Sequence, residues 1–219
     1  MRWILDHLDE LLATTWDHLG LALLPVLAGL LISLPLGYFA HRWRAVRAIL
    51  VPVSGLLYTI PSLALFVLMP LVLGTRILDP INVQVALTIY TVALLVRSVA
   101  DALDAVPGDT IAAATAIGYG PTRRFFAVDL PLSVPVLVAG IRVAAVSNIS
   151  LVSVGAIIGV GGLGFYLTHG SQLSPPNYAE IIAGIGLIVL LALVVDGLLA
   201  VLGRILTPWT RARAGRSPA

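Results

Sequence analysis

The segment Asp104–Pro131 reads DAVPGDTIAAATAIGYGPTRRFFAVDLP and separates two long apolar stretches of the chain. It is much longer than the turn that joins two neighbouring helices, which needs only about 2–8 residues. Pro107 favours the start of a short helix, because proline is tolerated in the first helical turn. The run AAATA continues this helix, and Gly118 and Gly120 then permit a sharp turn before a second short helix. We therefore expect a knob of two short helices joined at a glycine, with a small-residue surface on which another protein can pack.

The segments around this knob are too apolar for a soluble domain. Of the 219 residues, 59% are hydrophobic and 11% are charged, and the mean hydropathy is +1.02. Soluble domains carry about 45–50% apolar and about 25% charged residues. A helix that crosses a bilayer needs about 20 apolar residues. The sequence thus predicts a single all-α membrane domain with about five spans, at residues 19–40, 48–75, 80–106, 132–158 and 181–203.

The two ends of the chain and its arginines predict an orientation. Residues 1–18 are amphipathic and carry Trp3 and Trp16, so we expect a helix that lies in the membrane interface. Ten arginines lie on the side of the knob, and only Arg2 and Arg76 lie on the other. Because basic residues concentrate in cytoplasmic loops, we expect the N-terminus on the outer side of the cell membrane. The knob at residues 107–131 and the basic tail at 204–219 are then cytoplasmic.

The residue counts exclude several classes of function. All 13 basic residues are arginine, and the chain has no cysteine. Without lysine there is no Walker motif to bind nucleotide phosphates, and without cysteine there is no thiolate nucleophile. The four histidines match no metal-ligand spacing, and a net charge of +2 gives no footprint for nucleic acid. We therefore expect neither a catalytic residue, a metal nor a bound cofactor in this chain.

The knob resembles the cytoplasmic "EAA" loop of ABC-importer permeases. That loop has the pattern Glu-Ala-Ala-x-x-x-Gly, followed further along by Leu-Pro. Ala112 stands where the family has its glutamate, so any contact of that acidic group is missing here. The resemblance implies that the loop docks on a separate ATP-hydrolysing subunit, which binds the ATP. The residues implied in this coupling contact are Ala113, Ala114, Gly118, Tyr119, Leu130 and Pro131.

The resemblance covers nearly the whole chain. YTIPSLAL at Tyr58–Leu65, VLVAGIRV at residues 136–143 and IGVGGLG at Ile158–Gly164 are similar to segments of osmoprotectant permeases. Those permeases carry glycine betaine, choline, carnitine or proline, and methionine-type permeases share their fold. The resemblance implies the core of a type I ABC importer in a bacterial cell membrane, a second permease subunit of the same or a homologous kind, and an extracytoplasmic substrate-binding protein. The alternatives for function are a permease for methionine or another amino acid, and an ion-coupled secondary transporter.

Polar residues inside the spans are candidates for the translocation path. Pro61 removes a backbone hydrogen bond in the second span and bends it, and such breaks are tolerated where they face protein or a watery cavity. The polar side chains that can line such a path include Asn148, near the middle of the fourth span, where an unpaired amide is costly. The alternative for each is ordinary hydrogen bonding between helices. The path candidates are Tyr58, Pro61, Ser62, Tyr90 and Asn148.

Two charges lie inside the fourth and fifth spans. Arg142 and Asp196 have similar depths from the cytoplasmic side. A charge at the centre of a membrane helix costs about 2.5–3.5 kcal/mol on insertion scales, so it needs a partner or water. We expect either an ion pair between the two, or two side chains that extend separately toward the inner surface.

The glycines 159, 161 and 164 satisfy the spacing GxGxxG, but they follow an apolar span rather than a strand. A dinucleotide site needs a strand, the glycine turn and then a helix. We therefore expect these glycines to provide a sharp turn at the outer end of the fourth span.

Overall fold

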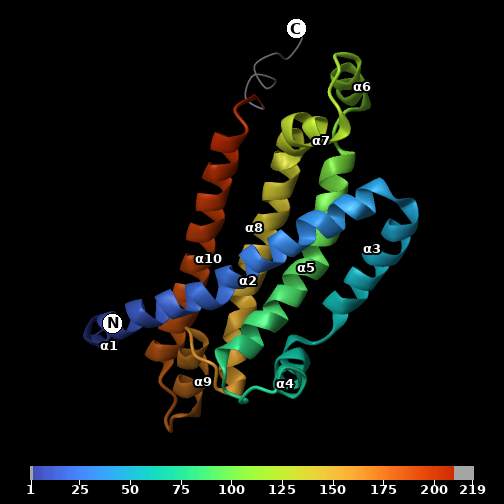
Figure 1. The fold of residues 1–219 in the computed structure, drawn as a ribbon. Helices are drawn as coiled ribbons and strands as arrows, with labels where there is room; N and C mark the ends of the chain where they lie inside the picture. Colours follow the sequence, from blue (N-terminus) through green and yellow to red (C-terminus); the bar gives the residue numbers. More distant parts are fainter. Residues whose placement is uncertain (1, 210–219) are drawn as a thin grey trace.

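The computed structural model describes residues 2–209, which contain helices and no strand. The all-α prediction is confirmed. Figure 1 shows a bundle of long helices with the short helices at its two ends. The helices are α1 (Arg2–Asp6), α2 (Leu8–Arg42), α3 (Arg44–Thr59), α4 (Ser62–Leu73), α5 (Pro80–Asp104), α6 (Gly108–Ala116), α7 (Pro121–Arg124), a π-helical turn (Phe125–Asp129), α8 (Leu130–Gly155), a 3₁₀ turn (Ala156–Ile158), α9 (Gly164–Gln172) and α10 (Tyr178–Leu206).

Among the described residues, four helical segments are long and apolar enough to cross a membrane. They are α2, α5, the helical run of residues 121–158 that contains α8, and α10. The pair α3 and α4 adds a fifth if it is one broken span. The expected number of about five spans agrees with this arrangement. Residues 210–219, which hold most of the predicted basic tail, lie outside the described part.

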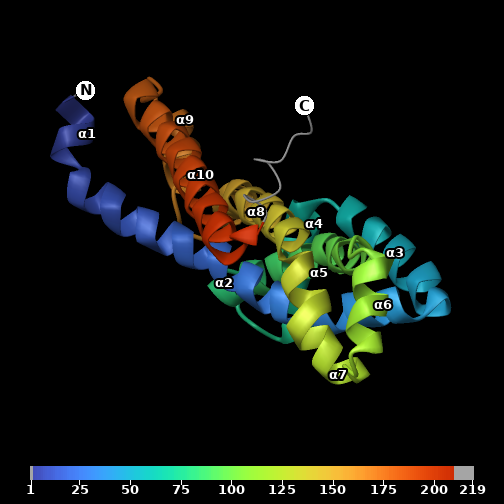
Figure 2. The ribbon, with the colours of Figure 1, turned by 90° about the horizontal axis from the view of Figure 1, so that it is seen from above.

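Helix α5 lies at the centre of the bundle and packs against α2, α3, α4 and α8. Figures 1 and 2 show α2 running obliquely across α5 and α8. Gly29, Ser33 and Gly37 lie one helical turn apart on α2 and are buried. A Cβ atom added at Gly37 would lie 2.5 Å from Cβ of Val99 on α5. Small residues thus let the two backbones approach closely, as is typical of membrane helix pairs.

The second apolar segment is not one straight span. The kink predicted at Pro61 within the span at 48–75 is a break between two helices, because α3 and α4 meet at 102°. Pro61 has φ −59° and ψ 129°, an extended conformation that ends α3 and precedes α4. The ring of a proline also disfavours helical geometry at the residue before it, and Ile60 is extended as well, with ψ 130°.

The N-terminal segment also differs from its prediction. Residues 8–18 are not a separate helix, because α2 runs without interruption from Leu8 to Arg42. Asp9 and Glu10 lie in its first turn, where acidic side chains stabilise a helix. Only the short α1 precedes it, and the ring of Trp3 stacks on that of His7 at 4.4 Å. The boundary expected at residue 18 was placed where the sequence changes from polar to apolar. The backbone hydrogen bonds of α2 continue past that point to Arg42.

Helix α9 is absent from the sequence prediction. It follows a turn in which Gly159, one of the three glycines expected to form a sharp turn, has φ 80°. The second positive φ, 94°, is at Gly162, which was not among the three, and Gly164 is already the first residue of α9. The chain then folds back, and the amide of Asn177 donates to the carbonyl of Gly170 at 2.9 Å. Helix α9 is short and of mixed polarity, whereas the spans were predicted from long apolar stretches, so the sequence contains no signal for it.

Candidate coupling loop and translocation surface

The knob forms at one end of the bundle, the same end at which α10 terminates (Figure 1). Helix α6 contains the alanine run and ends at Ala116, and Gly118 follows it with φ 89°. A positive φ disfavours any residue with a Cβ atom, so glycine meets the requirement of this turn. The amide of Tyr119 donates to the carbonyl of Ala114 at 3.1 Å and closes the turn. Helix α7 then starts at Pro121, so the expected two short helices joined at a glycine are present.

Arg124 holds the two halves of the knob together. Its Nε donates to Oδ2 of Asp129 at 3.3 Å, and its Nη1 donates to Oγ1 of Thr115 at 3.4 Å. The guanidinium of Arg123 lies 4.5 Å from the ring centroid of Tyr119, a cation–π distance. Leu130 starts α8 directly after the π-helical turn, with Pro131 in its first helical turn. A short and internally bonded path therefore connects α6 to α8.

The exposed surface of the knob includes two large apolar side chains. Ile117 is 76% exposed and Phe126 is 64% exposed. Ala113 is exposed as well, whereas Ala114 is buried at 6%. Exposed apolar groups outside a membrane are a typical sign of a protein contact.

A cluster of charged side chains lies at the base of the knob; we call it the base cluster. Arg47 on α3 donates from Nη1 to Oδ2 of Asp104 at 2.5 Å and from Nη2 to Oδ1 of Asp101 at 2.6 Å. His41 Nδ1 donates to Oδ1 of Asp104 at 2.5 Å, and Arg97 Nε lies 3.4 Å from Oδ2 of Asp101. The base cluster joins the junction of α2 and α3 to the end of α5 that leads into α6. Sequence reasoning missed it, although opposite charges on one predicted membrane side were a signal.

Tyr58, Pro61, Ser62 and Tyr90 come together at the bend between α3 and α4. The hydroxyl of Tyr90 donates to the carbonyl oxygen of Ile60. The rings of Tyr58 and Tyr90 meet edge to face, with centroids 5.7 Å apart. Tyr58 is 44% exposed, whereas Tyr90 is buried. The predicted path residues of the second span thus surround a backbone break that the central helix holds in place.

Asn148 lies apart from that group. Its Nδ2 donates to the carbonyl of Ala22 at 3.2 Å and to Oγ1 of Thr91 at 3.0 Å, and the residue is 2% exposed. The amide therefore joins α8 to α2 and α5, which is the alternative of ordinary hydrogen bonding between helices.

Arg142 and Asp196 form an ion pair between α8 and α10. Nε of Arg142 donates to Oδ1 of Asp196 at 2.7 Å, and Nη2 donates to Oδ2 at 2.6 Å. The two side chains are 38% and 33% exposed. Of the two alternatives from the sequence, the structure contains the paired one, with bidentate geometry.

His18 is a further buried polar group that sequence reasoning left without a role. Its Nδ1 accepts from the amide of Leu163 at 3.1 Å, and Nε2 lies 2.9 Å from the carbonyl of Ile149. This pattern requires the neutral ring with its proton on Nε2. The ring ties α2 to α8 and to the glycine turn before α9. Among the described residues, no group of three or more His, Asp or Glu side chains can hold a metal ion.

Residues 29–207 match the family described as "Binding-protein-dependent transport system inner membrane component". The chain belongs to this family. The permease is therefore a multi-pass membrane protein, the membrane subunit of a transport system that works with a binding protein. This match covers all of the knob and all of the spans except the first part of α2.

Known proteins similar to the permease agree with this family. It is 38% identical to the osmoprotectant import permease protein OsmW of Salmonella typhimurium over 216 residues, which cover 95% of the permease and 97% of that relative. It is 34% identical to the choline transport system permease protein OpuBB of Bacillus subtilis over 199 residues, 91% of the permease and 89% of the relative. The expected resemblance to osmoprotectant permeases is confirmed.

The fold matches solved importer permeases. A chain of the MetNI methionine ABC transporter, in an inward-facing conformation, superposes with a TM-score of 0.78 and 22% identity. The match covers 90% of the permease and 96% of that chain. The predicted methionine-permease-like core is therefore confirmed as a fold.

Proposed function

We propose that the permease forms the translocation path of an ATP-driven importer for compatible solutes such as glycine betaine, choline, carnitine or proline. The knob is the observation that carries this proposal. It is an internally bonded pair of short helices with exposed large apolar side chains. It is continuous with α8, and it follows the end of α5 that the base cluster joins to α3. The names of the similar permeases support the solute class.

The proposed complex contains two permeases, an ATP-binding subunit and an extracytoplasmic substrate-binding protein. ATP binds to the partner subunit, since this chain has no lysine for a Walker motif. The N-terminus lies outside, and the knob and C-terminus lie in the cytoplasm, as the arginine asymmetry supports. Closure of the ATP-binding subunits displaces α6 and switches the helices between outward-open and inward-open states.

Individual residues take different parts in this proposal. The exposed face of α6 beside Ala113 contacts the ATP-binding subunit, with Ala114 beneath it and the turn of Gly118 and Tyr119 at its end. Leu130 and Pro131 pass the displacement to α8. Tyr58, Pro61 and Ser62 form the surface of the path, whereas Tyr90 and Asn148 position the helices that carry it.

Uptake into proteoliposomes tests the proposal. The permease is reconstituted with its ATP-binding subunit and binding protein, and labelled glycine betaine, choline, carnitine, proline and methionine are offered separately. We expect uptake of at least one of the first four that requires ATP and the ATP-binding subunit. Uptake of methionine alone would move the permease to the amino-acid class. Uptake driven by an ion gradient without the ATP-binding subunit would contradict the proposal and favour a secondary transporter.

A further inference from the structure

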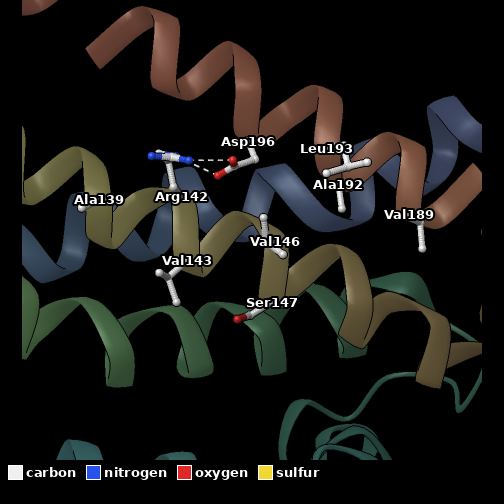
Figure 3. A pocket seen from close by; sticks show the side chains of 9 residues that line it. All are labelled: Ala139, Arg142, Val143, Val146, Ser147, Val189, Ala192, Leu193 and Asp196. Carbon is white, nitrogen blue, oxygen red and sulfur yellow. Dashed lines mark hydrogen bonds and ion pairs between the residues drawn. The ribbon is translucent and has the colours of Figure 1, made fainter. Parts of the chain in front are cut away.

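A groove of about 650 Å³ opens along the outside of α8 and α10 (Figure 3). Its walls are mostly aliphatic and include Val143 and Val146 from α8 and Val189 and Leu193 from α10. The ion pair of Arg142 and Asp196 lies in the same groove. Pockets for small molecules have this composition, since a few convergent polar groups fix a ligand among apolar walls.

The ion pair leaves binding capacity on both partners. A guanidinium has five N–H donors in a planar fork. Asp196 occupies only the edge of Arg142 that contains Nε and Nη2. In the part of the chain that the structure describes, Nη1 donates no hydrogen bond, so the edge of Nη1 and Nη2 is available for a second carboxylate. Each carboxylate oxygen of Asp196 accepts a single bond from Arg142 and keeps capacity for a cation.

The groove lies at the depth of the membrane core. Arg142 is on the thirteenth residue position of α8, and Asp196 is ten residues before the end of α10. At 1.5 Å per residue, both lie roughly 15–18 Å from the same end of the bundle. A half-exposed charge pair at that depth is costly against lipid and is typical of a substrate pathway.

We propose that this groove binds a small zwitterion in transit, one that carries a carboxylate and a quaternary ammonium group. The inference rests on the proposed function, and it assigns the site on the translocation path that binds the two charged groups of the solute. The solute carboxylate binds the free edge of Arg142, and the ammonium lies beside Asp196 with its methyl groups against the valine and leucine walls. A quaternary ammonium has no N–H donor, so charge, apolar contact and cation–π attraction are the interactions open to it, and the residues that line this groove offer the first two.

The charge balance favours this occupant over a lipid chain. A zwitterion brings one charge of each sign to a site that holds one of each sign, so no charge is left without a partner when it enters or leaves. An acyl chain contacts the aliphatic walls but gives the two charged groups no partner. A free cation leaves the available edge of Arg142 unused.

The test uses the complete complex in proteoliposomes with saturating binding protein. The first variant is the neutral pair Arg142→Gln with Asp196→Asn, which keeps the size of both side chains and leaves no lone charge. We expect normal assembly, ATP hydrolysis within about twofold of wild type, and glycine betaine uptake lowered about tenfold or more, because the solute loses its charge-assisted contacts with the groove. Arg42→Gln, an exposed arginine at the end of α2, is the matched control and should leave uptake unchanged.

The single variant Arg142→Gln tests whether Arg142 binds the carboxylate of the solute. We expect the ratio of glycine betaine to choline uptake to fall about tenfold, since choline has no carboxylate to lose a partner. The inference would be overturned if Arg142→Gln lowered the uptake of both solutes equally, or if the neutral pair kept normal glycine betaine uptake. Lipid or the second permease would then be the occupant of the groove. If the wild-type complex does not import choline, this ratio cannot be measured, and the glycine betaine uptake of the neutral pair alone tests the inference.

If the neutral pair does not assemble, a third variant tests the inference. The exchanged pair Arg142→Asp with Asp196→Arg keeps the ion pair but moves the guanidinium to α10. We expect it to restore assembly while glycine betaine uptake stays about tenfold below wild type. Full recovery of uptake would show that the pair only holds the helices together. A wild-type complex that imports none of glycine betaine, choline, carnitine and proline would instead contradict the proposed function, and the inference with it.

Discussion

Tyr90 of α5 donates its phenolic hydrogen to the carbonyl oxygen of Ile60, at the point where α3 and α4 meet at 102°. Pro61 has no N–H, and the extended backbone there ends the helical hydrogen bonding. A carbonyl freed in this way is costly within a membrane unless another group satisfies it. The central helix thus stabilises the bend that forms the proposed path surface.

Tyr90→Phe removes this hydrogen bond and keeps the ring against Tyr58. Because the carbonyl of Ile60 loses its donor, we expect the free energy of unfolding in detergent to fall by about 1–3 kcal/mol. Tyr178→Phe is the matched control, since Tyr178 is 69% exposed. Equal stability of the two variants would show that the bend does not depend on this contact.

Gly118 and Gly120 provide a matched pair in the knob. Both have open space where a Cβ atom would lie, but Gly118 has φ 89° and Gly120 has φ −66°. Gly118→Ala therefore strains the turn by about 1 kcal/mol or more, whereas Gly120→Ala does not. We expect ATP-driven uptake to fall severalfold in Gly118→Ala alone, and the bulkier Gly118→Trp to abolish it. Equal uptake by the two alanine variants would contradict this role of the turn.

His18 connects three elements through a neutral ring. His18→Phe leaves the amide of Leu163 without an acceptor and the carbonyl of Ile149 without its ring donor. We expect a loss of about 2–4 kcal/mol in unfolding free energy, since a buried unsatisfied group costs about 1–3 kcal/mol. His18→Gln keeps one donor and one acceptor and should lose less. A Gln variant as unstable as the Phe variant would indicate that ring shape, rather than hydrogen bonding, is what matters.

The base cluster is partly exposed, with side chains of Arg47, Asp101 and Asp104 that are 36–44% exposed. Solvent screens such pairs, so Arg47→Gln should lower unfolding free energy by about 1 kcal/mol or less. The loss should shrink as salt rises from about 0.05 to about 0.5 M, because screening weakens the wild-type pairs. Unfolding curves at both salt concentrations measure it, and a loss independent of salt would contradict an electrostatic role.

The features that depend on local sequence were predictable. Uncharged stretches predicted the spans, and the alanines with Gly118 predicted the knob and its turn. The bend at Pro61 was predicted as a kink, but the carbonyl it frees is satisfied by Tyr90, which lies on another helix. The Arg142–Asp196 pair was one of two alternatives, because spacing along two helices does not determine how they pack.

Other features depend on contacts between distant segments. His18 carries no signal in its own neighbourhood, and its partners lie more than 130 residues away. The base cluster needed the junction of α2 and α3 to meet the end of α5. The unbroken α2 was missed because a change in polarity was taken for a helix boundary.

The central claim is that the knob contacts the ATP-binding subunit, and site-directed cross-linking tests it most directly. The chain has no cysteine, so Ala113→Cys introduces a single thiol on the exposed face of α6. A second variant, Ile77→Cys, places it in the exposed turn before α5, at the opposite end of that helix. In the assembled complex, a short reagent that joins a thiol to an amine should link the permease to the ATP-binding subunit from position 113 and not from position 77. Linkage from position 77 alone, or none from position 113 in an intact complex, would contradict the account.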